Sequence, residues 1–333
     1  MADRHNGPSG EDSLIARYFK PLATDPGAFN LDDDAAALKA AGEDVVITTD
    51  AIVEGVHFLP GDPPDTLARK ALRVNLSDIA AKGAAPAGFV LTLALRGVEE
   101  AWLKPFAAAL GEDAAHYGCP LLGGDTVSTP GPLMISITAF ARVPAGRMVH
   151  RSGAHPGDRV VVTGSIGDAV LGLDVLKGGR VAEALAGDAA AREMLAARYR
   201  VPQPRNALAK AIRSHASAAM DVSDGLAGDL TKLCAASRVS AVIDVQSIPL
   251  SPVAAGLLAR KAIGIETLVA GGDDYEILCA IPGHRIEAFT REARQAGVAV
   301  TAIGGVIAGH SPPSFLDGQG RELALERLSY SHF

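Results

Sequence analysis

Strand and helix patterns alternate along the chain, and this alternation restricts the fold more than any other feature of the sequence. In the first half, apolar runs typical of strands occur at 45–49, 88–95 and 132–143, and helical patterns occur at 66–82 and 99–117. Alternating segments of this kind are typical of layered folds in which helices cover the faces of a sheet. We therefore expect an α/β or α+β protein.

A passage rich in Ser, Gly and Pro at 151–157 is followed by a second half of similar organisation. Beyond this passage, strand patterns occur at 159–163, 240–245, 274–281 and 298–303, with helical patterns between them. Passages of this composition commonly connect domains.

The length of the chain agrees with a division at that passage. A chain of 333 residues suggests about two domains of roughly 150 residues each. We predict one domain over 1–152 and a second over 153–333.

The charge of the chain excludes some classes of partner. It carries 31 Lys and Arg against 38 Asp and Glu, which gives a formal net charge of −7. Electrostatic binding to nucleic acid requires a basic surface, so we expect no nucleic-acid partner. Hydrophobic residues make up 48% of the chain, which is enough for a core and argues against predominant disorder.

The cysteines and the apolar segments indicate the compartment. Cys119, Cys234 and Cys279 are odd in number and form no Cys-x-x-Cys pair, which argues against a disulfide scaffold or a zinc ribbon. Residues 1–19 lack the apolar core of a signal peptide. The longest apolar stretch, 83–95, is too short for a bilayer span of about 20 residues. We expect a cytoplasmic protein with no membrane partner.

Several common nucleotide and hydrolase motifs are missing. The sequence contains neither a P-loop nor a Gly-x-Gly-x-x-Gly loop, and it contains neither His-Glu-x-x-His nor Gly-x-Ser-x-Gly. Any nucleotide must therefore be bound by a different arrangement.

Aspartate is in excess, with 24 Asp against 14 Glu, and much of it occurs in short motifs at predicted strand ends and turns. Carboxylates beside Ser or Thr hydroxyls suit Mg²⁺, and adjacent glycines let backbone N–H groups approach an anion. Any single Asp of this kind is more commonly a cap or turn residue. The motifs are Asp32-Asp33-Asp34, Thr48-Thr49-Asp50, Asn75-Leu76-Ser77-Asp78, Gly123-Gly124-Asp125, Asp221-Val222-Ser223-Asp224 and Gly271-Gly272-Asp273-Asp274.

Three side chains in or near these motifs admit more than one interpretation. Asp78 lies in an apolar helical pattern, where a carboxylate destabilises the fold unless it is paired or binds a metal. His57 is a ligand, an acid–base group or a histidine that is only hydrogen-bonded, and the last is the commonest case. Arg151 is either a phosphate-binding arginine or a surface residue at the domain boundary.

Taken together, the motifs resemble the thiamine-monophosphate kinase family, a branch of the aminoimidazole-ribonucleotide synthetase superfamily. The resemblance extends over essentially the whole chain, and the motifs occur in the family's order. The matching segments are 13–19, 48–58, 74–84, 123–126, 220–226, 271–276 and the terminal His332-Phe333.

This resemblance implies a two-domain fold and a reaction. The N-terminal domain is expected to bind ATP and Mg²⁺ and to form a homodimer through its sheet, and the C-terminal domain is expected to be α/β. The implied enzyme transfers a phosphoryl group from ATP to thiamine monophosphate and so forms thiamine diphosphate, with several Mg²⁺ ions and often K⁺.

The resemblance also implies which residues form the site. Catalysis there is expected to depend on metal ions and electrostatics, without a general acid or base. Magnesium ligands are implied at Asp33, Asp34, Thr48, Thr49, Asp50, Asp78, Asp125, Asp221 and Asp224. ATP contacts are implied at Gly124, Asp125, Arg151 and Ser223, and substrate contacts at His57, Asp273 and Tyr330.

The sequence departs from the family's pattern at three places. Asp32 stands where Gly is usual, and Asp273 stands where Glu is usual. The tail reads Ser329-Tyr330-Ser331 before its final His-Phe, where Gly, an aromatic residue and Asp are usual. All the acidic positions of the implied metal site are present.

The implied chemistry is physically consistent. A phosphate monoester with a second pKa of about 6 is already an anion at neutral pH, so it needs no general base. Two negative charges 4 Å apart repel by about 4 kcal/mol at an effective dielectric constant near 20, so cations must neutralise them. We expect direct in-line transfer to the acceptor oxygen, without a phosphoenzyme.

Two other interpretations remain open from the residues. One is another ATP-using enzyme of the superfamily that acts on a ribonucleotide amide or a carbamoyl group; His57 and the segment 271–276 argue against it. The other is a non-catalytic, dimeric metal-binding or regulatory protein. Retention of every acidic position argues against that, because carboxylates packed together without a function repel each other.

Overall fold

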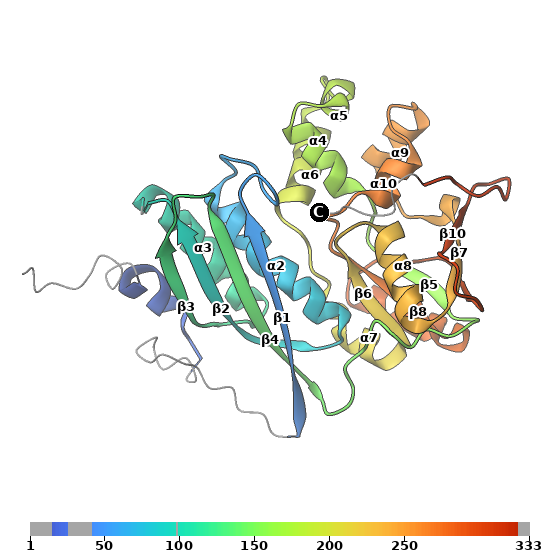
Figure 1. The fold of residues 1–333 in the computed structure, drawn as a ribbon, viewed down its shortest axis with the longest axis horizontal. Helices are drawn as coiled ribbons and strands as arrows, with labels where there is room; N and C mark the ends of the chain where they lie inside the picture. Colours follow the sequence, from blue (N-terminus) through green and yellow to red (C-terminus); the bar gives the residue numbers. More distant parts are fainter. Residues whose placement is uncertain (1–14, 26–41, 98, 326–333) are drawn as a thin grey trace, which may run out of the picture. The chain divides into compact units, whose positions relative to one another are not determined.

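The structure is a computed structural model that describes residues 15–25, 42–97 and 99–325 (Figure 1). Strands and helices alternate along these residues, as the sequence predicts. Short helical turns at Ile15–Phe19 and Lys20–Leu22 precede the first strand. In the part of the chain that is described, no helix is both long and apolar enough to cross a membrane.

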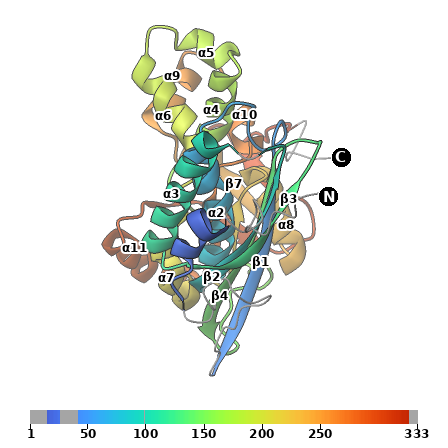
Figure 2. The same ribbon diagram turned by 90° about the vertical axis from the view of Figure 1, so that its left-hand side faces the viewer.

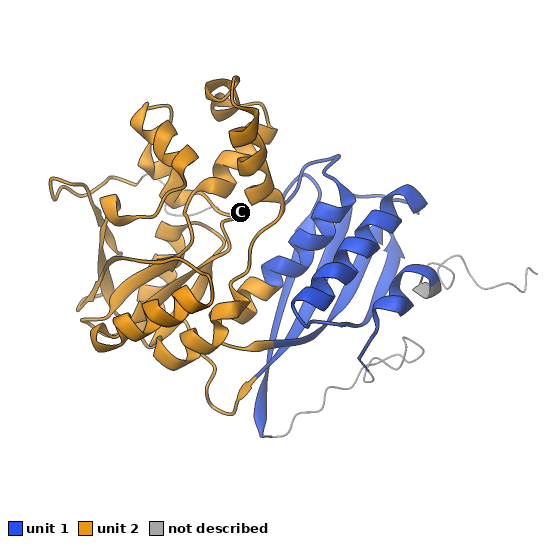
Figure 3. Ribbon diagram, turned by 180° about the vertical axis from the view of Figure 1, so that it is seen from behind, with its two compact units in different colours: residues 1–75, 86–142 blue, residues 76–85, 143–333 orange. Residues whose placement is uncertain are grey.

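The chain divides into two compact units (Figure 3). Unit 1 comprises residues 1–75 and 86–142, and unit 2 comprises residues 76–85 and 143–333. Each unit contains its own sheet.

Unit 1 is built on a four-stranded sheet in the order β1-β4-β2-β3. Helices α2 and α3 lie on one face of it (Figure 1; Figure 2). In β4, Ile135, Ile137 and Ala139 are fully buried and alternate with partly exposed residues, so the strand predicted at 132–143 is confirmed and has one covered face. The element bounds are β1 (Glu43–Val53), α2 (Pro64–Ala81), β2 (Ala85–Leu95), α3 (Glu100–His116), β3 (Leu121–Ser128) and β4 (Met134–Pro144).

A buried ion pair joins the two helices of unit 1. Asp113 of α3 accepts hydrogen bonds from Nε and Nη2 of Arg73 at 2.6 and 2.9 Å, and from Nη1 of Arg69 at 2.5 Å. Both arginines come from α2, so the bidentate contact fixes the register of α2 against α3.

Unit 2 is built on a six-stranded sheet in the order β10-β7-β9-β5-β8-β6. Only the β10–β7 pair in this order is parallel; the other neighbours are antiparallel. The strands are β5 (Arg159–Thr163), β6 (Ala218–Val222), β7 (Ser240–Asp244), β8 (Glu276–Ile281), β9 (Val300–Ile307) and β10 (Ser314–Leu316).

The helices of unit 2 form apolar clusters on both faces of this sheet. Leu226 and Leu230 of α8 pack against one face, and Ile212 of α7 and Phe289 of α11 pack against the other. A third cluster joins α4, α5, α6 and α9. The helices are α4 (Asp168–Leu176), α5 (Arg180–Ala184), α6 (Ala189–Arg200), α7 (Ala209–His215), α8 (Leu226–Ser237), α9 (Pro252–Ala259), α10 (Ile265–Ala270) and α11 (Ile286–Gln295).

Two acidic motifs lie inside strands, so the prediction that they lie at strand ends is wrong for them. Asp50 lies within β1, and the motif Gly123-Gly124-Asp125 lies within β3. A Cβ atom at Gly124 would come within 2.0 Å of the Leu91 carbonyl oxygen on β2. The glycine therefore permits close pairing of the two strands instead of ending one of them.

Asp274 caps the beginning of helix α4 from a distant part of the chain. Its carboxylate oxygens accept hydrogen bonds from the backbone N–H groups of Gly167 and Ala169, at 2.7 and 3.2 Å. Burial raises the pKa of Asp274 to about 8, although these two donors act in the opposite direction. The side chain therefore binds a proton more readily in the folded chain than in the unfolded one.

We expect this proton to make stability depend on pH. Between the ordinary pKa near 4 and the folded value of about 8, the folded state holds one proton more than the unfolded state, so stability falls as pH rises. From pH 6 to pH 8 the Asp274 contribution should fall by about 2 kcal/mol. Urea unfolding at pH 6, 7 and 8 measures this loss of stability. In the Asp274→Asn variant, the free energy of unfolding should depend less steeply on pH. Parallel profiles for the two proteins would contradict the expectation.

Two adjacent glycines of β9 provide a matched test of the packing. A Cβ atom at Gly304 would lie 2.1 Å from the Val242 carbonyl oxygen on β7, whereas one at Gly305 would meet nothing nearer than 3.7 Å. Gly304→Ala should lower the free energy of unfolding by about 2–3 kcal/mol, and Gly305→Ala should change it by less than about 0.5 kcal/mol. Urea unfolding compares them, and equal effects would show that the β7–β9 approach is not the constraint.

Candidate functional site

The predicted residues on β1 are tied into the sheet of unit 1. The Thr49 hydroxyl donates to the Ile137 carbonyl oxygen at 3.2 Å and accepts from the Thr138 hydroxyl at 2.9 Å, which joins β1 to β4. Thr48 is partly exposed and Asp50 is exposed on the same strand. The oxygen atoms of β1 therefore lie at one edge of the sheet.

Gly124 and Asp125 lie at the opposite edge, on β3. Asp125 is exposed and pairs in register with Thr92 of β2. In the strand order of this sheet, β4 and β2 separate Asp125 from Asp50. The sheet of unit 1 thus does not bring these two predicted magnesium ligands together.

His57 is held by the turn that follows β1. Its Nδ1 atom accepts a hydrogen bond from the Val53 N–H at 3.0 Å, and its carbonyl oxygen accepts one from the buried Lys70 ammonium at 2.8 Å. An accepting Nδ1 assigns the proton of the neutral ring to Nε2. His57 is thus hydrogen-bonded and its ring is oriented with Nε2 as the donor, while its role at the substrate stays a prediction.

In unit 2, Asp221 and Asp224 flank a loop that a third carboxylate organises. Asp221 lies in β6 and is 6% exposed. Asp229, in the first turn of α8, is fully buried and accepts hydrogen bonds from the N–H groups of Ser223 and Asp224, at 3.0 and 2.9 Å. Sequence reasoning missed Asp229, although an acid in the first turn of a helix is a recognisable signal.

Lys232 compensates the negative charge of this loop. Its ammonium donates to Asp224 at 2.5 Å and to Asp229 at 2.9 Å. Burial disfavours the charged lysine, but the hydrogen bonds to the two carboxylates outweigh burial and raise the pKa of Lys232. The Asp224 carboxylate therefore already has a cation beside it.

The segment 271–276 lies against the Asp221–Asp224 loop. The N–H groups of Asp273 and Tyr275 donate to the carbonyl oxygens of Ser223 and Val222, both at 2.8 Å. A Cβ atom at Gly272 would come within 2.5 Å of the Ser223 carbonyl oxygen, so the approach requires glycine there. Two predicted motifs that are far apart in the sequence thus form one surface.

The motif that contains Asp78 adjoins the same surface. The Ser77 hydroxyl donates to the Tyr275 carbonyl oxygen at 3.5 Å. The Lys82 ammonium donates to the Ala219 carbonyl oxygen at 3.0 Å, two residues before Asp221. Unit 2 therefore brings three of the predicted motifs together.

Lys82 is a second lysine of this region that sequence reasoning missed. Burial lowers the pKa of Lys82, while the charges of Asp221 and Asp78 act to raise it and that of Arg151 acts to lower it. These three predicted site residues are therefore within electrostatic range of one buried ammonium. No signal in the sequence distinguished Lys82 from other lysines at the ends of helices.

The donor atoms of unit 2 fit Mg²⁺. Across 15–25, 42–97 and 99–325, no group of three or more His, Cys, Asp and Glu side chains is arranged to hold a metal ion. Mg²⁺ is usually bound by one or two carboxylates together with water and substrate phosphates, and Asp221 and Asp224 supply two carboxylates on one loop. Asp33, Asp34 and Tyr330 lie outside the described residues.

Comparison with known proteins identifies the domains. Residues 32–143 match the sequence model of the AIR synthase related protein, N-terminal domain, and residues 155–315 match that of the AIR synthase related protein, C-terminal domain. The mixed α/β fold with two sheets therefore agrees with the predicted two-domain fold.

Individual relatives cover nearly the whole chain. The thiamine-monophosphate kinase of Caulobacter vibrioides is 44% identical over 98% of this chain and 91% of its own length. The crystal structure of thiamine-monophosphate kinase from Stenotrophomonas maltophilia K279a is 34% identical, with a TM-score of 0.80 over 94% of this chain and 96% of that one. The structure of AaThiL complexed with AMPPCP and TMP is 29% identical, with a TM-score of 0.76 over 90% of this chain and 91% of that one. On these relationships, the chain belongs to the thiamine-monophosphate kinase family.

Proposed function

We propose that this protein catalyses the ATP-dependent phosphorylation of thiamine monophosphate to thiamine diphosphate. The observation that carries the proposal is the joining of the segment 271–276 to the Asp221–Asp224 loop, with the motif of Asp78 adjoining both. These are the motifs that resemble the kinase family. The structure of the relative AaThiL in complex with AMPPCP and TMP supports the same reaction, because AMPPCP is an ATP analogue.

We propose that magnesium binds to the carboxylates and hydroxyls of the predicted set. In unit 2 these are Asp78, Asp221 and Asp224. The remaining members are Asp33, Asp34, Thr48, Thr49, Asp50 and Asp125. Bound Mg²⁺ supplies positive charge that neutralises phosphate oxygens. K⁺ belongs to the proposal because the family resemblance implies it.

The protein's own residues bind and orient the two phosphate groups in this proposal. Arg151 and Ser223 contact ATP, and Arg151 can do so with a guanidinium that lies near the Lys82 ammonium. Gly124 and Asp125 contact ATP from β3. His57 donates from Nε2 to the phosphate of thiamine monophosphate, because Nδ1 already accepts from the backbone.

No general base is required for this transfer. The acceptor phosphate, with a second pKa of about 6, is ionised at neutral pH. The barrier comes from repulsion between anions, about 4 kcal/mol for each pair of unit charges 4 Å apart at an effective dielectric constant of 20. We therefore propose direct in-line transfer, in which the chain contributes alignment and charge neutralisation.

We further propose a cytoplasmic homodimer in which residues 1–152 form the ATP-binding and dimerisation domain and residues 153–333 form the second domain. Apolar side chains on β1 and β3 support an interface at the sheet of unit 1. Val45 and Ile47 lie two residues apart on β1 and are 38% and 61% exposed, and Val127, at the other edge of the sheet, is 43% exposed; exposed apolar surface commonly marks an interface.

The reaction is tested by measuring ADP release with Mg²⁺ and ATP in three arms. These arms contain thiamine monophosphate, free thiamine or no acceptor. We expect ADP only with thiamine monophosphate, in equal amount to the thiamine diphosphate that chromatography detects. ADP release that is equal in all three arms, or no thiamine diphosphate at all, would overturn the proposal.

Substitution Asp78→Asn tests the proposed metal role within that assay. Loss of the carboxylate should lower turnover on the order of 100-fold or more, with an unchanged circular dichroism spectrum. Asp65→Asn, in the first turn of the same helix, is the matched control and should keep normal activity. Near-normal turnover in Asp78→Asn would remove Asp78 from the metal site.

The dimer is tested by placing a charge on the exposed face of β1. Ile47→Lys should convert the protein from a dimer to a monomer in light scattering coupled to gel filtration, because a buried unpaired ammonium is strongly disfavoured at an apolar interface. Val56→Lys, at a 49% exposed position outside the strands of the sheet, should leave the dimer intact. A dimeric Ile47→Lys protein would rule out this face as the interface.

A further inference from the structure

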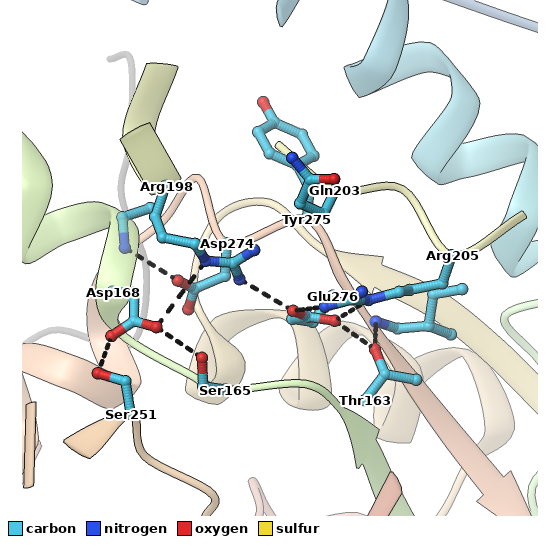
Figure 4. Close-up of polar contacts among 12 residues, drawn as sticks. Thr163, Ser165, Asp168, Arg198, Gln203, Arg205, Ser251, Asp274, Tyr275 and Glu276 are labelled. Carbon is cyan, nitrogen blue, oxygen red and sulfur yellow. Dashed lines mark hydrogen bonds and ion pairs between the residues drawn. The ribbon is translucent and has the colours of Figure 1, made fainter. Parts of the chain in front are cut away.

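A completely buried carboxylate at the start of β8 has a full set of hydrogen-bond donors. Glu276 is 0% exposed, and its Oε2 atom accepts from the Thr163 hydroxyl and from Arg205 Nε, both at 2.6 Å (Figure 4). Its Oε1 atom accepts from Nη2 of Arg205 at 2.5 Å and from Nη2 of Arg198 at 2.9 Å. We call Glu276, Arg198, Arg205 and Thr163 the Glu276 cluster.

The chain is built closely around this cluster. Gly164 has a φ of +58°, and a Cβ atom there would lie 2.0 Å from Glu276 Oε1, so only glycine fits. The Thr163 hydroxyl also accepts from the Ile277 N–H at 2.8 Å. Arg198 lies 3.8 Å from Asp168, which extends the same polar region to the start of α4.

The cluster is more elaborate than stability alone requires. Replacing a buried ion pair by apolar side chains of similar volume is often neutral or stabilising. Two arginines on one carboxylate therefore indicate a need for a fixed geometry at this place. The feature that they fix should lie on the chain next to Glu276.

The backbone immediately before Glu276 is held in a disfavoured conformation. Among the described residues, the non-glycine residues with positive φ are Arg238, Lys261, Asp273 and Tyr275. Arg238 and Lys261 follow helices α8 and α9, where a left-handed residue is common. Asp273, with φ +71°, and Tyr275, with φ +50°, follow no helix end in this way. Such residues persist only where their surroundings hold them, and they concentrate at functional sites.

The side chains of this segment alternate between two environments. Asp274 and Glu276 are buried. Asp274 accepts hydrogen bonds from the start of α4, and Glu276 accepts them from the other members of the Glu276 cluster. Asp273 and Tyr275 are partly exposed, and the Tyr275 ring points away from the Glu276 carboxylate (Figure 4). The buried pair therefore anchors the segment, and the other pair presents a carboxylate and an aromatic ring.

We propose that Glu276, Arg198 and Arg205 are positioning residues that hold Tyr275 and Asp273 to bind the positively charged ring of the substrate. This inference rests on the proposed function, because the thiazolium ring of thiamine monophosphate carries a permanent positive charge. An aromatic face attracts such a cation, and a neighbouring carboxylate adds to the attraction. Tyr275 would be the contact residue, and the Glu276 cluster acts through it.

Substitution at Arg205 tests the positioning role. In Arg205→Met, Glu276 keeps Arg198 and Thr163 as partners, so the protein should fold. The KM for thiamine monophosphate should rise about 10-fold, while the KM for ATP stays within about 2-fold. Arg205→Lys retains the charge without the bidentate contact and should recover part of the loss. Arg192→Met, at an exposed position on the same helix as Arg198, is the control and should match the wild type.

A double-mutant cycle separates positioning from a general structural effect. Tyr275→Leu should raise the KM for thiamine monophosphate about 10-fold, and Tyr275→Phe, which keeps the ring, should change it by less than about 3-fold. If Arg205 acts through Tyr275, Arg205→Met adds no further increase in the Tyr275→Leu background. A roughly 100-fold increase in the double variant would overturn the proposal.

The remaining outcomes distinguish this inference from the proposed function. A lowered Tm with both KM values unchanged would mean that the cluster is only structural, and it would overturn the inference alone. If Arg205→Met does not fold, the Tyr275 variants decide, and an unchanged KM in Tyr275→Leu overturns the inference. Absence of thiamine diphosphate with the wild-type protein would overturn the proposed function itself.

Discussion

Two backbone hydrogen bonds hold the candidate site of unit 2 together. They run from the N–H groups of Asp273 and Tyr275 to the carbonyl oxygens of Ser223 and Val222. They extend the antiparallel pairing of β6 with β8 into the loop after β6 and the segment before β8. Because main-chain groups make both bonds, the contact depends on backbone conformation, and Gly272 permits the approach by leaving out a side chain. The contact places Asp273 beside the Asp221–Asp224 loop.

Buried carboxylates provide the second level of organisation, and they have three kinds of partner. Asp229 binds two backbone N–H groups and an ammonium, and Asp274 caps a helix. Glu276 binds two guanidinium groups, and Asp113 does the same in unit 1. Each carboxylate would be costly to bury alone; Asp229 is satisfied by donors near it in the sequence, and the other three by donors from distant segments. The acidic residues of the chain thus divide into buried structural anchors and candidate ligands, of which Asp221 is itself buried.

Much of the architecture could be predicted, because apolar periodicity decides which segments become strands and long helices. Strand β5 begins and ends as predicted, and the predicted strand at 132–143 corresponds to β4. The short helices α9 and α10 and strand β10 were not predicted, since they offer too few turns or residues for a periodic signal. The site motifs could be recognised by resemblance. Arg198 and Arg205 could not, because ion pairs between distant segments leave no trace in local spacing.

The position of Lys232 bears on how cations enter the site. Its ammonium already lies against Asp224 and Asp229, and Lys82 places a second ammonium within range of Asp78 and Asp221. A cation that binds to Asp224 therefore exchanges with a tethered one instead of entering an uncompensated anionic site. When a metal ion displaces the Lys232 ammonium from the carboxylates, the charge beside them changes by less than when a metal ion binds to carboxylates that have no cation nearby. Lys232 also lowers the repulsion between Asp224 and Asp229 in solutions of low ionic strength, where carboxylates without a nearby cation would repel each other most strongly.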